Sequence, residues 1–155
     1  LDVFSRHGVL SEVELTARKE IGLRSYVKHA MIEAVTMLKV SRQKLLPACV
    51  KYSGALANAA AAVEGVGCDA GPHRVMLETL CTAIADFQEA IGNLALAYED
   101  VQNMGKDNLA RARAVQDFIL PRMSALRACA DKLEIMVDKE FWPLPSYGEM
   151  MFNLN

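Results

Sequence analysis

The chain has no long hydrophobic run, although apolar residues make up 52% of its 155 residues. A membrane-spanning helix needs about 20 consecutive, predominantly apolar residues. The longest uncharged stretch lies between Lys51 and Glu64 and falls short of that length. We therefore expect one globular domain over residues 1–155, long enough to bury a sizeable core.

The chain also lacks an excess of either charge. Its 17 Lys and Arg residues nearly balance its 19 Asp and Glu residues, which gives a net charge of −2. That balance offers no electrostatic reason to expect nucleic acid or a membrane as a partner. No signal-peptide pattern opens the sequence, and we expect a cytoplasmic protein. The sequence starts at Leu1 without an initiator methionine, so a fragment of a longer protein is expected.

Closely spaced cysteines are missing as well. The four cysteines are Cys49, Cys68, Cys81 and Cys129. They form no Cys-x-x-Cys motif and no pair with histidine, which argues against a zinc site. Free, buried thiols in a reducing compartment are the expected state.

Motifs that would carry catalysis, metal or phosphate are absent. A di-metal site in a helical bundle needs Glu three residues before His, yet those positions hold Phe4, Tyr26 and Ala70. His29 and Glu33 lie one helical turn apart, and a surface contact is favoured over half a ligand set. The glycine-rich stretch 65–71 has no preceding strand and no lysine, which favours a turn over a phosphate loop. The residues predict no catalytic, cofactor or metal site in this chain.

Helical periodicity dominates what is present, and no segment has a strand pattern. The first helix is predicted over 11–64, where Ser11 and Glu14 form a capping box. One stripe of this helix contains Val27, Met31, Ala34, Leu38, Ser41, Leu45, Ala48, Tyr52, Ala55, Ala59 and Ala62. Pro47 lies inside the stripe and predicts a kink or a short break.

Two further helices are predicted over 73–104 and 106–140, with Asp107 or Asn108 as the cap of the last one. The apolar seam of the second consists of Leu77, Leu80, Ile84, Phe87, Ile91, Leu94, Tyr98 and Val101. The stripe of the third consists of Leu109, Ala112, Gln116, Ile119, Met123, Leu126, Ala130, Leu133 and Val137, with a kink expected at Pro121. Gln116 is interpreted as a register device or an edge position. The fold class is all-α, an antiparallel bundle of three to four long helices after a lead-in over 1–10.

The C-terminal tail, residues 141–155, is predicted to be extended because its two prolines exclude helix. It is unusually apolar for a terminus. One reading is that it packs on its own bundle, and the other is that it docks on another domain or subunit. The candidate docking residues are Trp142, Pro143, Pro145, Tyr147 and Phe152.

Three blocks of the sequence resemble the C-terminal region of type III glutamine synthetases. The first runs from Phe4 to Leu15 and continues with Arg18 and Glu20. The second comprises Ile32–Leu38, Leu45–Ala48 and Tyr52. The third is the tail motif Trp142–Gly148, the most distinctive of the three. The blocks follow the family's order and span nearly the whole chain.

The resemblance implies a parent enzyme that condenses glutamate with ammonia, using ATP and Mg or Mn, through a γ-glutamyl phosphate. Its catalytic residues would lie upstream of this chain, and none of them is carried over to a residue here. The expected partners are the catalytic domain of the same chain and neighbouring subunits of a homo-oligomer. The expected function is structural and assembly-related.

A second hypothesis is a free-standing helical-bundle module for protein interaction or regulation, without catalytic activity. Under that hypothesis the apolar tail would recognise an unrelated partner. The coding sequence upstream of Leu1 discriminates between the two, because only the first requires a catalytic domain there.

Overall fold

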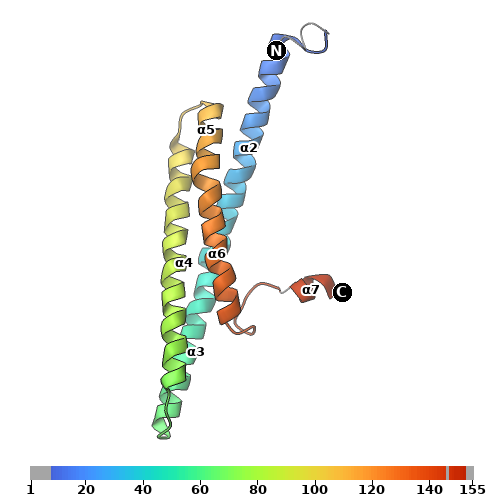
Figure 1. The fold of residues 1–155 in the computed structure, drawn as a ribbon. Helices are drawn as coiled ribbons and strands as arrows, with labels where there is room; N and C mark the ends of the chain where they lie inside the picture. The colour runs from blue at the N-terminus through green and yellow to red at the C-terminus, as the bar shows by residue number, and fades with distance from the viewer. Residues whose placement is uncertain (1–7, 146, 153–155) are drawn as a thin grey trace.

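The computed structural model describes residues 8–145 and 147–152, and these residues form helices and no strand. Three antiparallel rods lie side by side (Figure 1). In chain order the elements are α2 (Glu12–Val40), the π-helical turn η1 (Ser41–Leu45), α3 (Leu46–Gly65), α4 (Gly71–Asn103), α5 (Asn108–Ala114), the π-helical turn η2 (Val115–Ile119), α6 (Leu120–Met136) and α7 (Tyr147–Phe152). The predicted all-α bundle is confirmed.

The first rod begins with the predicted capping box. The Ser11 hydroxyl accepts from the Glu14 backbone N–H at 3.3 Å, and the Glu14 carboxylate accepts from the Ser11 backbone N–H at 2.8 Å. The Ser11 hydroxyl also donates to the Glu14 carboxylate, at 2.7 Å. The bond from the Ser11 backbone N–H and, second, the bond from its hydroxyl lower the pKa of Glu14. The bonds of the two backbone N–H groups satisfy donors that a helix start otherwise leaves unpaired.

Pro47 and Pro121 each follow a π-helical turn, and neither breaks its rod. Pro47 and Pro121 occupy the second position of α3 and α6, directly after η1 and η2. In each turn a backbone bond spans five residues, from Leu46 N–H to Ser41 O and from Leu120 N–H to Val115 O. A proline in a regular α-turn meets the carbonyl four residues back. We attribute the π turns to relief of that clash, so that each rod continues.

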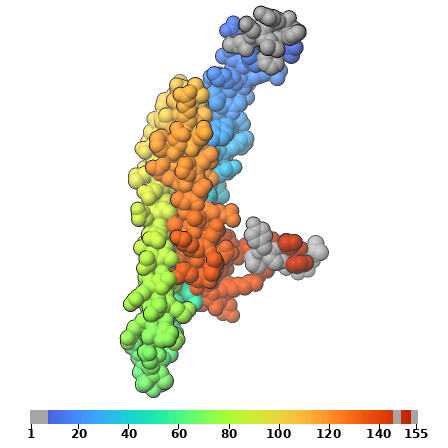
Figure 2. Space-filling model, in the orientation of Figure 1, coloured from blue at the N-terminus to red at the C-terminus, as the bar shows by residue number. Residues whose placement is uncertain are grey.

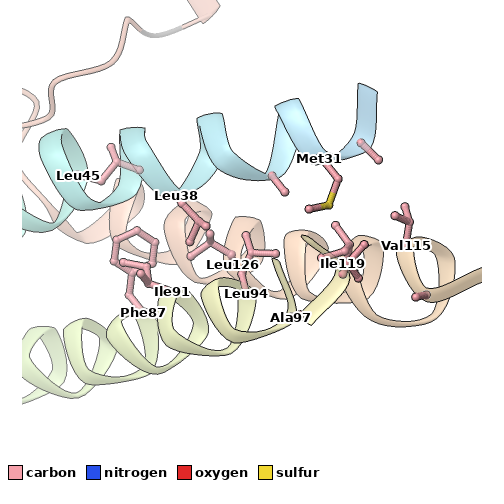
Figure 3. Close-up of a cluster of buried hydrophobic side chains, with 14 of the residues drawn as sticks. Met31, Leu38, Leu45, Phe87, Ile91, Leu94, Ala97, Val115, Ile119 and Leu126 are labelled. Carbon is pink, nitrogen blue, oxygen red and sulfur yellow. The ribbon is translucent and has the colours of Figure 1, made fainter. Parts of the chain in front are cut away.

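The core lies between the three rods, and Figure 3 shows part of it. Phe87, Leu94 and Ile119 are fully buried at its centre. On α4 the predicted seam is correct, because Leu80, Ile91 and Val101 are also buried and its remaining members are half-buried. The first stripe is correct as far as Ala48.

The stripes deviate where the π turns and α-helical drift change the phase. In the first rod Ala59 and Ala62 are exposed, and Ala60 is buried instead. In the third rod Gln116 is exposed and Val115 is fully buried. An α-helix drifts against a strict seven-residue repeat, and a π turn adds a further residue to one turn. The interpretation of Gln116 as a register device inside the stripe is therefore wrong, and an outward-facing position is correct.

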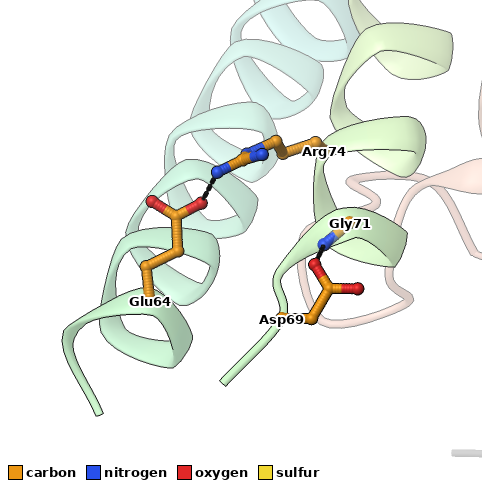
Figure 4. Close-up of polar contacts among 4 residues, drawn as sticks. All are labelled: Glu64, Asp69, Gly71 and Arg74. Carbon is orange, nitrogen blue, oxygen red and sulfur yellow. Dashed lines mark hydrogen bonds and ion pairs between the residues drawn. The ribbon is translucent and has the colours of Figure 1, made fainter. Parts of the chain in front are cut away.

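The loop between α3 and α4 is tied to both helices (Figure 4). Arg74 pairs with Glu64 across the loop, and the Asp69 carboxylate accepts from the Gly71 backbone N–H at 2.8 Å. Gly67 has a φ of +81°, which a residue with a side chain rarely adopts. These features make the segment a structural turn, as its glycine content predicts.

The second turn joins α4 to α5. The Asp107 side chain accepts from the backbone N–H groups of Leu109 and Ala110 and caps α5, as predicted. Asn108 donates to the Glu20 carboxylate at 2.8 Å and so links α5 to α2. N-terminal to that contact, α2 projects beyond the bundle (Figure 1).

The last rod and the tail differ from the predicted boundaries. α6 ends at Met136, whereas the sequence predicts a helix to residue 140. Residues 147–152 form α7 rather than extended chain. The prolines exclude helix only at and just before their own positions, so the chain after Pro145 is free of that constraint.

Candidate docking site

A tight turn after α6 positions the start of the tail. The Asp138 side chain accepts from the Glu140 backbone N–H at 2.7 Å, a local bond that competes with continuation of the helix. The backbone N–H groups of Phe141 and Trp142 then donate to the Asp138 carbonyl at 2.9 and 3.1 Å. Because of this turn, the side chains of Phe141 and Trp142 pack against the bundle.

Phe141 and Trp142 anchor the tail to the hydrophobic core. The Phe141 ring lies 5.4 Å from the Tyr52 ring, centroid to centroid, at an interplanar angle of 56°. Such tilted aromatic pairs are favourable beyond the area that they bury. Trp142 is half-buried against the core cluster, and its indole Nε1–H is buried without a hydrogen-bond acceptor among the described residues.

Beyond Trp142 the tail leaves the body of the protein. Pro143 and Pro145 are exposed, and α7 stands off from the side of the bundle (Figures 1 and 2). An ion pair of 3.0 Å between Lys139 and Glu149 links α7 to the turn. We refer to residues 141–152 as the strap.

The strap carries a run of exposed apolar side chains. Leu144 is 41% exposed, and the last three residues of α7 are more exposed still. They are Met150 at 58%, Met151 at 69% and Phe152 at 79%. Contiguous exposed apolar surface of this kind is typical of interaction sites.

A groove of about 410 Å³ lies between the strap and the bundle. Its apolar lining comes from the first rod, the third rod and the strap. The lining residues include Met37, Val40, Leu126, Ala130, Trp142, Leu144, Pro145 and Met150. Ser41 of η1 also lines it, although that residue is only 4% exposed. Thr36, Arg127, Asp131 and Glu134 line it as well. The groove is therefore mainly apolar, open to solvent and closed on one side by the strap.

The predicted docking residues fall into two groups. Trp142 packs on the bundle, while Pro143, Pro145 and Phe152 are exposed. The side chain of Tyr147 lies outside the described part of the structure. Sequence reasoning omitted Leu144, Met150 and Met151 from the candidate set, although their apolar character in a terminus was available as a signal.

The cysteine thiols are all free, but only one of them is buried. Cys49 is fully buried, and desolvation raises the pKa of its thiol to about 11. Cys68 and Cys81 are exposed, and Cys129 is half-buried. The expectation of buried thiols is therefore correct for Cys49 and wrong for Cys68 and Cys81, which lie in the loop and on the outer face of α4.

Within residues 8–145 and 147–152, no three His, Cys, Asp or Glu side chains come together as a metal-ligand set. No helix in this part of the chain is long and apolar enough to cross a membrane. The geometry that stands out is instead the apolar strap with its groove.

Comparison with known proteins finds similarity to one kind of enzyme. Residues 1–64 match the model of the glutamine synthetase C-terminal domain, a stretch that contains α2, η1 and nearly all of α3. A glutamine synthetase of Butyrivibrio fibrisolvens is 29% identical over 99% of this chain. The chain is thus similar to the C-terminal part of this glutamine synthetase.

Two further glutamine synthetases are similar to this chain. A type-3 glutamine synthetase of Dictyostelium discoideum is 25% identical over 98% of the chain, and a glutamine synthetase of Bacteroides fragilis is 23% identical over 93%. The similarity therefore extends past the first rod into the second and third. The chain spans about a fifth of the length of these relatives, 20–22%.

Proposed function

We propose that this chain is the C-terminal helical domain of a type III glutamine synthetase and serves its structure and assembly. The observation that carries the proposal is the similarity of 98–99% of the chain to the C-terminal part of two glutamine synthetases, one of them a type-3 enzyme. In the proposed parent, ATP, Mg or Mn, glutamate and ammonia bind upstream of Leu1. No residue described here is assigned to them.

The proposed partners are the catalytic domain of the same chain and neighbouring subunits of a homo-oligomer. The strap supports this proposal because its apolar side chains beyond Trp142, which are Leu144, Met150, Met151 and Phe152, are exposed and lie outside the core of the bundle. The anchoring turn fixes where the strap starts, and the prolines at 143 and 145 stiffen the segment that follows. A preorganised segment loses less conformational entropy on docking than a floppy one.

Trp142 gives the docking proposal a polar component. A buried indole N–H without an acceptor costs about 1–3 kcal/mol. A docked surface that supplies a carbonyl or carboxylate near the groove would recover that energy. Tryptophan is also among the residues most often found at the energetic centre of interfaces.

Catalysis and assembly are tested separately in the gene product that contains this chain. We expect glutamine formation from the full-length protein and none from residues 1–155 alone. Robust synthesis by residues 1–155 would contradict the proposal. So would a coding sequence without a catalytic domain upstream, which would favour the free-standing interaction module.

For assembly, the full-length protein is compared with a form truncated after Trp142, in which the anchor stays and the rest of the strap is removed. We expect the truncation to shift the particle mass in solution toward smaller assemblies while the helix content is retained. An unchanged mass distribution would contradict the docking role of the strap. The variant Leu96→Ser, which changes an exposed apolar residue on α4, serves as the control.

A further inference from the structure

A second exposed surface lies on the first rod, on α2 and the start of η1, away from the strap. It consists of six side chains, each next to the buried stripe of that rod and spaced at three or four residues. They are Arg24, Lys28, Ile32, Val35, Lys39 and Arg42. The spacing places them on one face of the helix, with two cations at each end and two apolar residues between them.

Two adjoining hollows run along this face. The first has a volume of about 330 Å³ and lies between α2, α4 and the start of α5. The second has a volume of about 430 Å³ and lies between α2 and α4. Val35, Tyr98 and Gln102 line both, so the hollows form one continuous groove. It spans residues 24 to 43 of the first rod, or roughly 28 Å at 1.5 Å per residue.

The divergence of the rods opens this groove. α2 leans away from α4 and α5 toward its N-terminal end (Figure 1). The Asn108–Glu20 hydrogen bond ties α2 to α5 near that end. The groove is thus built between helices whose relative position is fixed by the core and by this bond.

The chemistry of the groove is cationic at its ends and apolar at its centre. Ile32 is 51% exposed and Val35 is 42% exposed. Glu99 is the one carboxylate among the residues that line the two hollows. Arg111 also lines the groove, and its Nε–H is buried without an acceptor among the described residues.

We propose that this groove binds an acidic amphipathic helix of a partner polypeptide. Carboxylates near both ends of such a helix would pair with the four cations of this surface, which are Arg24, Lys28, Lys39 and Arg42. One further carboxylate would reach Arg111. Apolar residues at its centre would cover Ile32 and Val35. A groove of roughly 28 Å accommodates about five helical turns. This helix-in-groove mode uses apolar anchors for affinity and charge for orientation.

The charge pattern favours an acidic helix over a polyanion such as nucleic acid. A nucleic acid backbone would contact a continuous row of cations, whereas here two exposed apolar residues interrupt the row. The inference stands apart from the proposed function, because it concerns a different face of the bundle and any partner that carries such a helix.

The test uses the 155-residue chain and a synthetic helical peptide of about 19 residues. The peptide carries two central leucines one turn apart and two glutamates toward each end on the same face. Its binding is followed by fluorescence anisotropy at low ionic strength. We expect saturable binding that weakens as salt is added, since exposed charges are screened. Two control peptides carry lysine for glutamate or serine for leucine, and neither should bind measurably.

Two variants locate the binding site. The double variant Lys28→Gln/Lys39→Gln should weaken peptide binding roughly tenfold, given the modest strength of each exposed pair. Ile32→Ser should also weaken it several-fold. The matched control Lys51→Gln/Lys132→Gln removes two exposed cations elsewhere and should leave the affinity unchanged. Circular dichroism checks that each variant retains its helix content.

Several results would overturn the proposal. Absence of saturable binding up to about 1 mM peptide is one. Binding of the lysine peptide as tight as that of the acidic peptide is a second. A third is a loss of affinity in Lys51→Gln/Lys132→Gln as large as that in Lys28→Gln/Lys39→Gln. Competition by duplex DNA as effective as that by the acidic peptide would assign the surface to a polyanion. A shift of the free protein to a dimer that Lys28→Gln/Lys39→Gln abolishes would assign it to a second copy of this chain.

Discussion

The burial of Val115 rather than Gln116 provides a sharp test of the third rod. The turn η2 places Val115 fully inside the core and leaves Gln116 exposed, although the two residues are neighbours. Exchanging each of them for alanine therefore probes the helical phase at this point. Alanine has the highest helix propensity, so neither variant weakens the backbone preference for helix.

The expected magnitudes differ several-fold. Val115→Ala removes two buried methyl groups, each stabilising by about 0.8 kcal/mol, and leaves a small cavity. The free energy of unfolding should fall by about 2–3 kcal/mol, which lowers the Tm by roughly 5–10 °C in a protein of this size. Gln116→Ala changes an exposed side chain and should stay within about 0.5 kcal/mol of the parent chain.

Urea unfolding followed by far-UV circular dichroism measures both variants against the parent chain. A common slope against urea concentration shows that the surface exposed on unfolding is unchanged, so that the midpoints report stability. A loss in Gln116→Ala equal to or larger than that in Val115→Ala would refute the phase and, with it, the π turn at η2.

Three further predictions concern other parts of the chain. A thiol reagent at neutral pH should label the exposed Cys68 quickly and leave Cys49 unlabelled until the protein unfolds. Burial excludes the reagent from Cys49 and raises the pKa of its thiol to about 11. Early labelling of Cys49, measured by mass spectrometry, would contradict this. Ala60→Glu buries a carboxylate and should lower the free energy of unfolding, measured by chemical denaturation, by about 2 kcal/mol or more. Ala59→Glu lies at an exposed position and should change it little. The reverse order would show that the register of α3 is wrong. Ser11→Ala should remove a cap worth about 1 kcal/mol from the end of α2 that projects beyond the bundle. Hydrogen exchange should therefore rise in the first turns of α2 while the Tm changes little. A large fall in Tm would mean that this end is packed in solution.

Much of the fold follows from the sequence for a simple reason. Apolar residues recur at helical spacing over three long segments, and the two turns carry strong local signals in Gly67 and Asp107. The capping box at Ser11 is equally local. Such features depend on neighbours within four residues, which the sequence displays directly.

The errors arise where a strict repeat is continued into or past a π turn. The alternation of three and four residues places Gln116 on the stripe, although Val115 beside it is the more apolar residue and both lie in η2. A π turn near a proline changes the phase, and its presence depends on how the rods pack together. The helix α7 was missed because the effect of Pro143 and Pro145 was extended to residues that they do not constrain.

The candidate docking site was predictable in composition but not in shape. The apolar tail is visible in the sequence, whereas the anchoring of Phe141 on Tyr52 joins residues far apart in the chain. The groove beside Ser41 likewise needs two rods and the strap together. Contacts of this kind follow from tertiary packing, which one sequence does not display.

The most direct test of the central claim is the assembly state of the full-length protein when the end of the strap is made polar. In the triple variant Met150→Ser/Met151→Ser/Phe152→Ser the exposed apolar surface of α7 is lost while the anchor at Trp142 stays. Val75→Ser/Met76→Ser changes comparably exposed apolar residues on α4 and serves as the matched control. The account predicts smaller particles by mass photometry for the triple variant alone. An unchanged particle mass in the triple variant would contradict it.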